Sequence, residues 1–455
     1  MTISSSAGPT SKLQPDTPAS VLMARIEDKT ATIAVVGLGY VGLPLARAIH
    51  EAGYRVVGFD TDTRKIDRLN RGENYLHHLG ADLARRLGAS DRFEATADPG
   101  KLAGVDALLL CLPTPLGPHR EPDLSFLLRS TRMVASILRR GQLVVLESTT
   151  YPGTTRDEMM PILEESGLRC GEDFFLAYSP EREDPGRKGV TTSSITKLVA
   201  GVDDLSGDLA AALYGRVVEK VHRVSCAEVA EAAKLLENVY RAVNIALVNE
   251  LKTLLADMGI DVWEVIEAAS TKPFGFEPFY PGPGLGGHCI PIDPFYLAWK
   301  AKAIGHSTKF IELAGEINAR MPEYVVARAI SALNDQGRAL RGARVLVLGI
   351  AYKPNIDDIR ESPAAAIIER LQAGGAEVSY HDPHVPTFPP MRKYAFDLRS
   401  VPLNEKTLRD HDCVLIVTDH DAVDYDLIGK HATLVVDSRN AMARVEKPAA
   451  RVVKA

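Results

Sequence analysis

A single cysteine, Cys289, lies in the segment GPGLGGHCIPIDP, which spans residues 282–294. Four glycines and three prolines surround this thiol. Because glycine and proline favour turns over regular structure, the pattern predicts that Cys289 is held on a tight loop. A cysteine that only fills a core needs no such surroundings, so Cys289 is a candidate for a chemical role.

A second polar pattern lies on a long predicted helix. From about residue 225, apolar residues recur every three or four positions without an internal proline, which predicts a helix that ends at Gly259 and is followed by another. Lys234 and Asn238 are four residues apart and Arg241 is one turn further, so the three form a polar stripe. Taken alone, such a stripe is typical of solvated residues on an amphipathic helix.

A glycine-rich turn near the N-terminus predicts a dinucleotide site. The segment ATIAVVGLGYVGLPLARAI (residues 31–49) reads as a buried strand, a turn and a helix, with Gly37, Gly39 and Gly42 at GxGxxG spacing. In this arrangement the first glycine permits the turn, the second admits a pyrophosphate and the third allows close packing. The amide groups at the helix N-terminus favour phosphate.

An acidic residue after the second predicted strand identifies the cofactor. YRVVGFD ends in Asp60, eighteen residues after Gly42. A carboxylate there binds a ribose diol and repels a 2′-phosphate. Arg64 and Lys65 could favour NADP, but Asp60 outweighs them, so NAD is the predicted cofactor.

Three further apolar runs end in small or acidic residues, at 105–115, 142–150 and 174–183. Ligands of open α/β sheets bind beyond the carboxyl ends of the strands. Ordinary turn chemistry explains each run singly. Together they predict one crevice, lined by Thr114, Glu147, Ser148, Thr149 and Glu181.

The C-terminal third repeats the strand–loop rhythm. Residues 345–348 read as a buried strand followed by Gly349, but Ala351 replaces the next fingerprint glycine. The predicted fold class is α/β, with two doubly wound Rossmann-like domains joined by a helical central domain. The predicted boundaries are a disordered tail at 1–28, an NAD-binding domain at 29–222, a helical central domain at 223–325 and a nucleotide-binding domain at 326–455.

Composition excludes several classes of protein. The 455 residues are 45% hydrophobic and 25% charged, with a net charge of −6, which provides no general attraction for nucleic acid or anionic membranes. The five scattered cysteines favour a reducing compartment, and no metal-binding motif is present. No signal peptide or membrane-spanning run is recognised, so a cytoplasmic protein is expected.

Seven motifs together resemble a known family. VVGLGYVGLPLA, PTP, EST, SPERE, EAAKLLENVYRAVNIALVNE, GPGLGGHCIPIDP and YKPNIDDIRESPA occur in the order seen in the nucleotide-sugar 6-dehydrogenases of the UDP-glucose and UDP-mannose type. The resemblance extends from about residue 31 to about 445. It implies that a primary alcohol at C6 of a UDP-sugar is oxidised to a carboxylate, with two NAD consumed.

The resemblance implies a role for the cysteine loop. By matching position, Cys289 is the nucleophile that adds to the aldehyde, forming a thiohemiacetal and then a thioester that water releases. Lys234 stabilises the developing oxyanion, and Asn238 donates to the same oxygens. Asp293 and Thr149 hold the hydrolytic water, and Glu181 is the acid/base candidate. His288, although adjacent to Cys289, is expected to have a structural or substrate-facing role.

Binding residues follow from the same resemblance. The cofactor set is Gly37, Gly39, Gly42, Asp60, Arg64, Thr114, Thr149 and Arg360, the last reaching from the C-terminal domain or pairing instead with Asp357 or Glu361. The substrate set is Glu181, Arg182, Lys234, Asn238, Arg241, Phe279, Tyr280, Gly286, Lys353 and Arg439, with Asn244 as a further contact. The family's central domain dimerises, so at least a homodimer is expected.

The cysteine loop is most similar to the branch that acts on UDP-N-acetylhexosamines. Its His288 and Ile292 depart from the pattern of the UDP-glucose enzymes, which favours UDP-N-acetylglucosamine. The galacto epimer, UDP-N-acetylmannosamine and UDP-glucose remain alternatives. A two-electron dehydrogenase without a catalytic cysteine and a non-catalytic nucleotide sensor are the rival classes.

Overall fold

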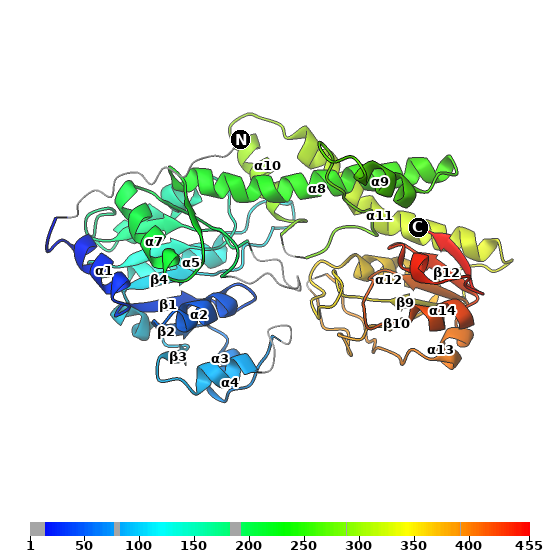
Figure 1. The fold of residues 1–455 in the computed structure, drawn as a ribbon, viewed down its shortest axis with the longest axis horizontal. Helices are drawn as coiled ribbons and strands as arrows, with labels where there is room; N and C mark the ends of the chain where they lie inside the picture. Colours follow the sequence, from blue (N-terminus) through cyan, green and yellow to red (C-terminus); the bar gives the residue numbers. More distant parts are fainter. Residues whose placement is uncertain (1–13, 77–81, 183–192, 288, 392) are drawn as a thin grey trace. The chain divides into compact units, whose positions relative to one another are not determined.

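The computed structural model describes residues 14–76, 82–182, 193–287, 289–391 and 393–455. The chain divides into two compact units, unit 1 up to Leu236 and unit 2 from Glu237 onward. Figure 1 shows the sheet at the centre of each unit; the strands of both sheets run mainly parallel. His288 lies outside the described residues.

Unit 1 is built on an eight-stranded sheet of order β3-β2-β1-β4-β5-β6-β7-β8. All neighbouring strands are parallel except β6 and β7. The chain leaves β1 for β2 on one side and later returns for β4 on the other, so the carboxyl ends of β1 and β4 form the switch point where such folds bind ligands. The strands are β1 (Thr32–Val36), β2 (Arg55–Phe59), β3 (Phe93–Thr96), β4 (Ala107–Leu110), β5 (Leu143–Leu146), β6 (Phe175–Tyr178), β7 (Lys197–Gly201) and β8 (Val221–Arg223).

The central strands of unit 1 are apolar throughout because both of their faces are covered. Every residue of β4, β5 and β6 is buried, as expected for parallel strands between helical layers. The helices of unit 1 are α1 (Pro18–Glu27), α2 (Gly42–Glu51), α3 (Thr63–Asn70), α4 (Asp82–Gly88), α5 (Ser125–Ala135), α6 (Met160–Glu164) and α7 (Asp204–Gly215), with 3₁₀ turn η2 (Pro99–Gly104) and π turn η3 (Thr154–Met159).

Helix α1 corrects the prediction of a disordered tail that reaches residue 28. Thr17 caps the helix, since its side chain accepts a hydrogen bond from the backbone of Ser20, and Pro18 occupies the first turn. Leu22 and Ile26 are buried in the core of unit 1. The Ser-, Thr- and Pro-rich composition of the N-terminus concealed a short amphipathic helix.

A helix of 31 residues, α8 (Ala227–Asp257), begins in unit 1 and continues into unit 2 (Figure 1). It ends just before Gly259, whose φ of 71° stops a right-handed helix. The other helices of this region are α9 (Val262–Ser270), α10 (Asp293–Ala303) and α11 (Lys309–Asn334). The predicted long helix and its break at Gly259 are therefore confirmed.

Unit 2 also contains a five-stranded parallel sheet of order β10-β9-β11-β12-β13. The predicted fold class, with a parallel Rossmann-like sheet at each end and a helical central region, is confirmed. The strands are β9 (Arg344–Leu348), β10 (Glu377–His381), β11 (Cys413–Ile416), β12 (Leu434–Asp437) and β13 (Arg451–Lys454). The accompanying helices are α12 (Pro363–Ala373), α13 (Glu405–Asp410), α14 (Tyr425–His431) and 3₁₀ turn η4 (Ala441–Arg444).

Candidate active site

The turn between β1 and α2 has the form of a phosphate cradle. Gly37 has a φ of +95°, and a Cβ there would lie 2.2 Å from the carbonyl oxygen of Cys111. A Cβ on Gly42 would lie 1.8 Å from the carbonyl oxygen of Gly37, so the close packing of strand and helix requires glycine. Gly39 has open space on its Cβ side, as the approach of a pyrophosphate requires. The cradle fits a dinucleotide.

Asp60, just after β2, is held beside this cradle. One of its carboxylate oxygens, Oδ2, accepts a hydrogen bond of 2.9 Å from the backbone of Leu38 and pairs with Lys65 at 2.8 Å. The carboxylate is thus fixed at the strand end, where a ribose diol binds in such folds. Arg64 forms an ion pair with Asp62 instead, and its side chain is 87% exposed. Its role in cofactor binding therefore stays a prediction.

The predicted crevice residues lie at the carboxyl ends of β4, β5 and β6. Thr114 is buried and Thr149 is half-buried. Ser148 ties the loops together, because its hydroxyl accepts from the Leu112 amide and donates to the Leu112 carbonyl, both at 2.8 Å. The structure therefore places these residues beyond neighbouring strands, as the sequence predicted.

Glu181 belongs to a largely buried ion-pair network centred on Lys197. Lys197, the first residue of β7, places its Nζ 2.7 Å from Glu147 Oε2 and 3.4 Å from Glu181 Oε2. The hydroxyl of Tyr214 donates to the other oxygen of Glu147. Sequence analysis placed Glu147 and Glu181 at one crevice, but it missed the lysine and the tyrosine that join them.

Lys197 keeps this network charged. Burial opposes its charge, but the nearby carboxylates Glu147 and Glu181 raise the pKa of Lys197 above its ordinary value. Burial, aided by the repulsion of Glu181, raises the pKa of Glu147. Two carboxylates share one ammonium group, and Glu181 is the more exposed of the two. The lysine thus holds Glu181 in place at the edge of the crevice.

Replacing Lys197 with Met is expected to lower the free energy of unfolding by about 3–5 kcal/mol, because Glu147 would remain buried without its counter-charge. Urea denaturation at pH 7 measures the change. Lys220, which is exposed, provides the control: Lys220→Met is expected to change stability by less than about 0.5 kcal/mol. A loss below about 1 kcal/mol in Lys197→Met would show that the pair is not needed for stability.

A buried carboxylate fixes the start of α8. Glu231 accepts hydrogen bonds from the Gly153 amide at 2.7 Å, the Thr155 amide at 3.0 Å and the Thr155 hydroxyl at 2.7 Å. Lys234 follows three residues later and is only 8% exposed. Lys234 is thus not a solvated surface residue, so the ordinary explanation for the polar stripe does not hold at this position.

Asn238 and Asp293 form a buried pair in unit 2. The Asn238 amide donates to Asp293 Oδ2 at 2.6 Å, and both residues are buried. Asp293 begins α10, and its backbone amide donates to the Cys289 carbonyl at 2.8 Å. Cys289 itself is exposed. The predicted loop therefore carries the thiol and, four residues later, a carboxylate that accepts a hydrogen bond from Asn238 on α8.

The glycines of the cysteine loop allow it to lie against the segment between β9 and α12. The Gly287 amide donates to the Arg360 carbonyl at 2.9 Å. A Cβ on Gly286 would lie 2.5 Å from the Cβ of Tyr352, and Gly287 has a φ of +83°. Arg360 pairs with Asp358 at 2.6 Å, an acidic neighbour that the sequence analysis did not consider. These glycines are required by contact and by conformation.

The other predicted substrate residues differ in their surroundings. Arg241 and Tyr280 are exposed, and Tyr280 stacks on Trp263 with ring centroids 5.7 Å apart. Phe279 meets Tyr240 edge to face, with ring centroids 5.6 Å apart. The remaining members are Lys353, which is half-buried, Arg182, which donates to the Thr196 carbonyl at 2.9 Å, and Asn244, which donates to the Tyr240 carbonyl at 2.7 Å.

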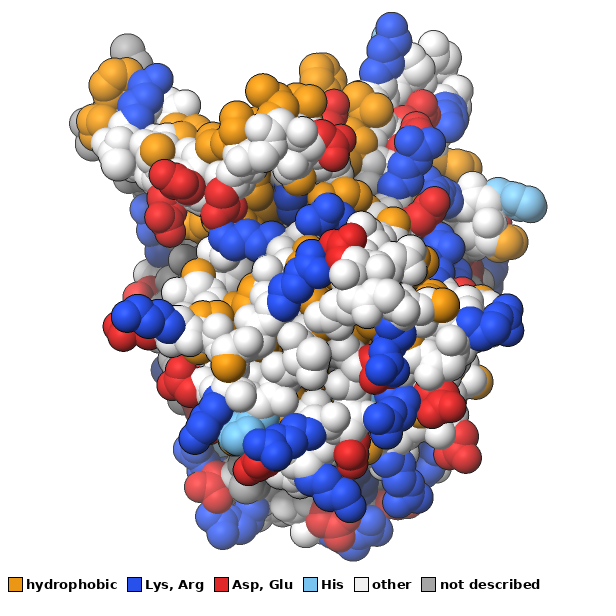
Figure 2. Space-filling model, turned by 90° about the vertical axis from the view of Figure 1, so that its right-hand side faces the viewer, with side chains coloured by type: hydrophobic (Ala, Val, Ile, Leu, Met, Phe, Trp, Pro, Cys, Tyr) orange, Lys and Arg blue, Asp and Glu red, His pale blue; other side chains and the backbone are white. Residues whose placement is uncertain are grey.

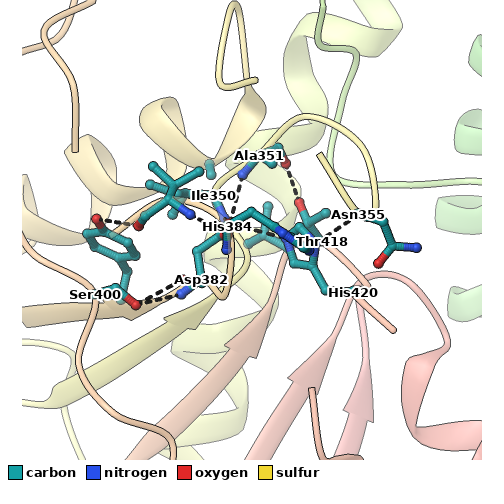
Figure 3. Close-up of polar contacts among 12 residues, drawn as sticks. Ile350, Ala351, Asn355, Asp382, His384, Ser400, Thr418 and His420 are labelled. Atoms are coloured by element: carbon teal, nitrogen blue, oxygen red, sulfur yellow. Dashed lines mark hydrogen bonds and ion pairs between the residues drawn. The ribbon is translucent and has the colours of Figure 1, made fainter. Parts of the chain in front are cut away.

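In unit 2, Asp382 follows β10 as Asp60 follows β2 in unit 1, but its carboxylate is not available to a ribose. Asp382 accepts hydrogen bonds from the Ile350 amide at 2.7 Å and from the Ala351 amide at 3.1 Å, and it pairs with His420 at 3.1 Å (Figure 3). The Asn355 amide donates to His420 Nδ1 at 3.0 Å, so the proton that faces Asp382 is on Nε2. The side chains of Asp382 and His420 are fully buried. This sheet therefore cannot hold NAD in the way that the first sheet does.

Asp382→Asn is expected to lower the free energy of unfolding by about 2 kcal/mol at pH 7. Although burial alone would raise it, hydrogen bonds from His420 and backbone amides bring the pKa of Asp382 below its ordinary value of 3.8. A depressed carboxyl pKa contributes stability above that value and loses it as the pH falls through the folded pKa. The difference between wild type and variant, measured by urea denaturation at pH 7, 5 and 3.5, should therefore shrink at the lowest pH; a constant difference would contradict the ionic role.

Two features are absent from the described parts of the chain. No helix there has the length and apolarity to cross a membrane. No group of three or more His, Cys, Asp or Glu residues there could hold a metal ion.

The fold and the cradle define an NAD-binding α/β protein. A second sheet, in unit 2, is of the Rossmann-like type that binds nucleotides. Three family models match the chain in order: the UDP-glucose/GDP-mannose dehydrogenase family NAD binding domain at residues 31–218, the central domain at 228–320 and the UDP binding domain at 346–444. The chain belongs to the UDP-glucose/GDP-mannose dehydrogenase family. It is an NAD-dependent UDP-sugar dehydrogenase and thus an oxidoreductase.

Individual relatives match almost the whole chain. The UDP-N-acetyl-D-glucosamine 6-dehydrogenase of Pseudomonas aeruginosa is 38% identical over 86% of this chain and 91% of its own length. The UDP-N-acetyl-D-mannosamine dehydrogenase of Pyrococcus horikoshii is 37% identical over 90% of this chain and 95% of its own. A solved structure of the UDP-D-ManNAc dehydrogenase from P. horikoshii superimposes with a TM-score of 0.82 at 34% identity, covering 93% of this chain and 98% of that one.

Proposed function

We propose that the protein is a UDP-N-acetylglucosamine 6-dehydrogenase, which oxidises the C6 alcohol of the sugar to a carboxylate in two steps. The observation that carries the proposal is the 38% identity, over nearly the full length, with the P. aeruginosa enzyme of that name. The match of 37% to a UDP-N-acetylmannosamine enzyme favours that epimer as the second candidate. Both relatives are named for an N-acetylated hexosamine, the class of sugar that the cysteine loop favours.

The first step removes a hydride and a proton from the C6 alcohol. Bound NAD accepts one hydride in each oxidation. Lys234 is proposed to stabilise the alkoxide, because a buried ammonium acts strongly on developing negative charge. Asn238 has one donor engaged by Asp293 and a second N–H that can donate to the same oxygen. Both residues are buried on α8, which supports these roles.

The second step proceeds through Cys289. Its thiolate is proposed to add to the C6 aldehyde, and the thiohemiacetal loses a hydride and a proton to become a thioester. Water then cleaves the thioester, which releases the carboxylic acid and regenerates the thiol. Asp293, held by Asn238, and Thr149 are the proposed partners of that water, and Glu181 is the proposed acid/base.

The binding roles predicted from the sequence remain proposals. NAD is assigned to the glycine cradle, Asp60, Thr114, Thr149, Arg64 and Arg360. The UDP-sugar is assigned to Arg182, Arg241, Phe279, Tyr280, Gly286, Lys353 and Arg439, together with Glu181, Lys234 and Asn238. The four predicted sections of the chain keep their boundaries in this proposal, except that α1 belongs to the first folded unit.

A substrate panel tests the proposed substrate. Initial rates with UDP-N-acetylglucosamine, its galacto and manno epimers and UDP-glucose should give the highest kcat/KM for UDP-N-acetylglucosamine. We expect UDP-glucose to be at least about 100-fold poorer, because a pocket built for an acetamido group leaves its polar groups unpaired with glucose. A preference for the manno epimer would replace the proposed substrate, and activity with none of the four would refute the assignment.

An exposed apolar stripe supports the proposed homodimer. Leu247, Leu251 and Leu254 on α8, and Met258 just after it, recur every three or four residues on one face, and all are exposed. Phe310 and Leu313 on α11 are exposed as well. Figure 2 shows hydrophobic side chains gathered at the top of the view. An apolar stripe of this length is typical of a helical interface, and we propose a second copy as its partner.

Leu254→Asp is expected to convert a dimer to a monomer at micromolar concentration, because it would bury a charge in the interface. Sedimentation velocity measures the change. Ala256→Asp is the control, since Ala256 is exposed on the opposite side of α8. A wild-type protein that is monomeric at 50 μM, or a dimer that tolerates Leu254→Asp, would contradict the proposed interface.

A further inference from the structure

Lys252 is a buried lysine that the proposed reaction does not use. It lies on α8 in unit 2 and is 5% exposed. Its Nζ is 3.3 Å from the Gly282 carbonyl and 5.3 Å from the centre of the Tyr324 ring. Within the described residues, no carboxylate forms an ion pair with Lys252. Lysine is rarely buried without a counter-charge, because desolvation of an ammonium is costly.

A second cation, Arg439, lies at the same glycine. Arg439 follows β12, and a Cβ on Gly282 would be 2.6 Å from its Nη1. Its Nε donates to the Val417 carbonyl at 2.8 Å. The nearby Asp437 is occupied, since its two oxygens accept from the backbone amides of Arg439 and Met442 at 2.9 and 2.8 Å. In the part of the chain that the structure describes, Arg439 therefore forms no ion pair either.

The two cations act on each other. Burial, followed by the repulsion of Arg439, lowers the pKa of Lys252 to about 7, against a weaker opposing effect of Asp437. Burial lowers the pKa of Arg439 to about 10, although Asp419 and Asp437 oppose the shift. A site that penalises its own positive charges in this way favours an anionic ligand.

Anchoring of the loop at Gly282 does not explain why Lys252 is buried. The Gly282 amide already donates to Asn249 Oδ1 at 2.9 Å, and Asn249 is held by Asn318, whose amide donates to the Ala242 carbonyl at 3.1 Å. These neutral amides fix the glycine from the same face of α8. One long bond from an ammonium to a carbonyl adds little to them.

We propose that Lys252 and Arg439 together bind the diphosphate of the UDP-sugar, with Lys252 as a substrate-binding residue that the sequence did not reveal. The proposal rests on the UDP-sugar as substrate and adds a residue to its site. An arginine fork and a lysine point charge are complementary ligands for phosphate oxygens. The central and UDP-binding segments of the family each contribute one of the two cations.

The proposal predicts that a proton is taken up when UDP binds. At pH 8 the free Lys252 is mostly neutral, and an adjacent diphosphate should raise the pKa of Lys252 above 8. Binding should then take up as much as about 0.9 proton per site. UDP itself is fully ionised at this pH, because the last phosphate pKa is about 6.

Calorimetric titration with UDP at pH 8, in two buffers of different ionisation enthalpy, measures both affinity and proton uptake. Lys252→Met should bind UDP at least about tenfold more weakly, without proton uptake. Lys252→Arg should bind within about threefold of the wild type, also without uptake, because arginine stays charged. A thermal melt of each variant shows whether the fold is intact.

The outcomes separate this proposal from the proposed function. If wild type binds UDP without proton uptake, or Lys252→Met binds as tightly as wild type, the role of Lys252 is refuted and the UDP-sugar assignment stands. Weaker binding by both variants, with a wild type that takes up no proton, would show a structural role for Lys252 and would refute the proposal. A wild type without measurable affinity for UDP would refute both.

Discussion

Cys289→Ala is expected to lower the rate of uronate formation by at least about 10⁴-fold, because the proposed thioester forms on its sulfur. The variant should still bind UDP and NAD, since the alanine removes only the sulfur atom. Any turnover that remains should stop at the aldehyde. Stopped-flow absorbance at 340 nm measures NADH, and mass spectrometry of the quenched products measures the uronate.

Cys170→Ala is the matched control for this experiment. Cys170 is half-buried in unit 1, where burial raises the pKa of its thiol to about 12, so it is a poor nucleophile. The control should retain the wild-type rate. If Cys289→Ala forms uronate within tenfold of the wild-type rate, the cysteine is not the nucleophile, and a two-electron dehydrogenase becomes the better description.

Lys234→Met is expected to lower kcat by about 10³-fold with a smaller change in KM, because the ammonium acts on charge that develops in the transition state. The buried position of Lys234, three residues after the anchored Glu231, supports this expectation. Steady-state kinetics at saturating NAD measure both constants.

The control for Lys234 is Lys272→Met, since Lys272 is exposed and its ammonium lies over the ring of Phe274 in unit 2. It should leave kcat unchanged. If Lys234→Met raises KM and preserves kcat, the lysine stabilises the ground state as strongly as the transition state. Its proposed role at the oxyanion would then be wrong.

The sheets were predictable because parallel strands that are covered on both faces must be continuously apolar. The strands predicted around 33–36 and 345–348 are present as β1 and β9. The glycine cradle was predictable because its packing restricts the residue type: the contact of Gly42 with the Gly37 carbonyl leaves no room for a side chain. Helix α1 was missed because its composition resembles that of a tail, although Thr17 and Pro18 are typical of a helix start.

The buried ionic contacts were not predictable from local sequence. Lys197 pairs with Glu147 across 50 positions of the chain, and nothing near either residue indicates its partner. Lys252 lies on a helix where a lysine is usually solvated, and its burial depends on the loop at Gly282 and on the Tyr324 ring. The pairing of Asn238 with Asp293 likewise depends on how α10 folds back to α8. Such contacts are set by tertiary packing.

The central claim is that one cysteine allows two successive oxidations of the same carbon. The most direct test is the ratio of NADH formed to UDP-N-acetylglucosamine consumed, measured at complete conversion with excess NAD. We predict a ratio of two with one uronate released per sugar. A ratio of one, with the aldehyde as final product, would contradict the covalent mechanism, and the absence of NADH would contradict the proposed enzyme activity.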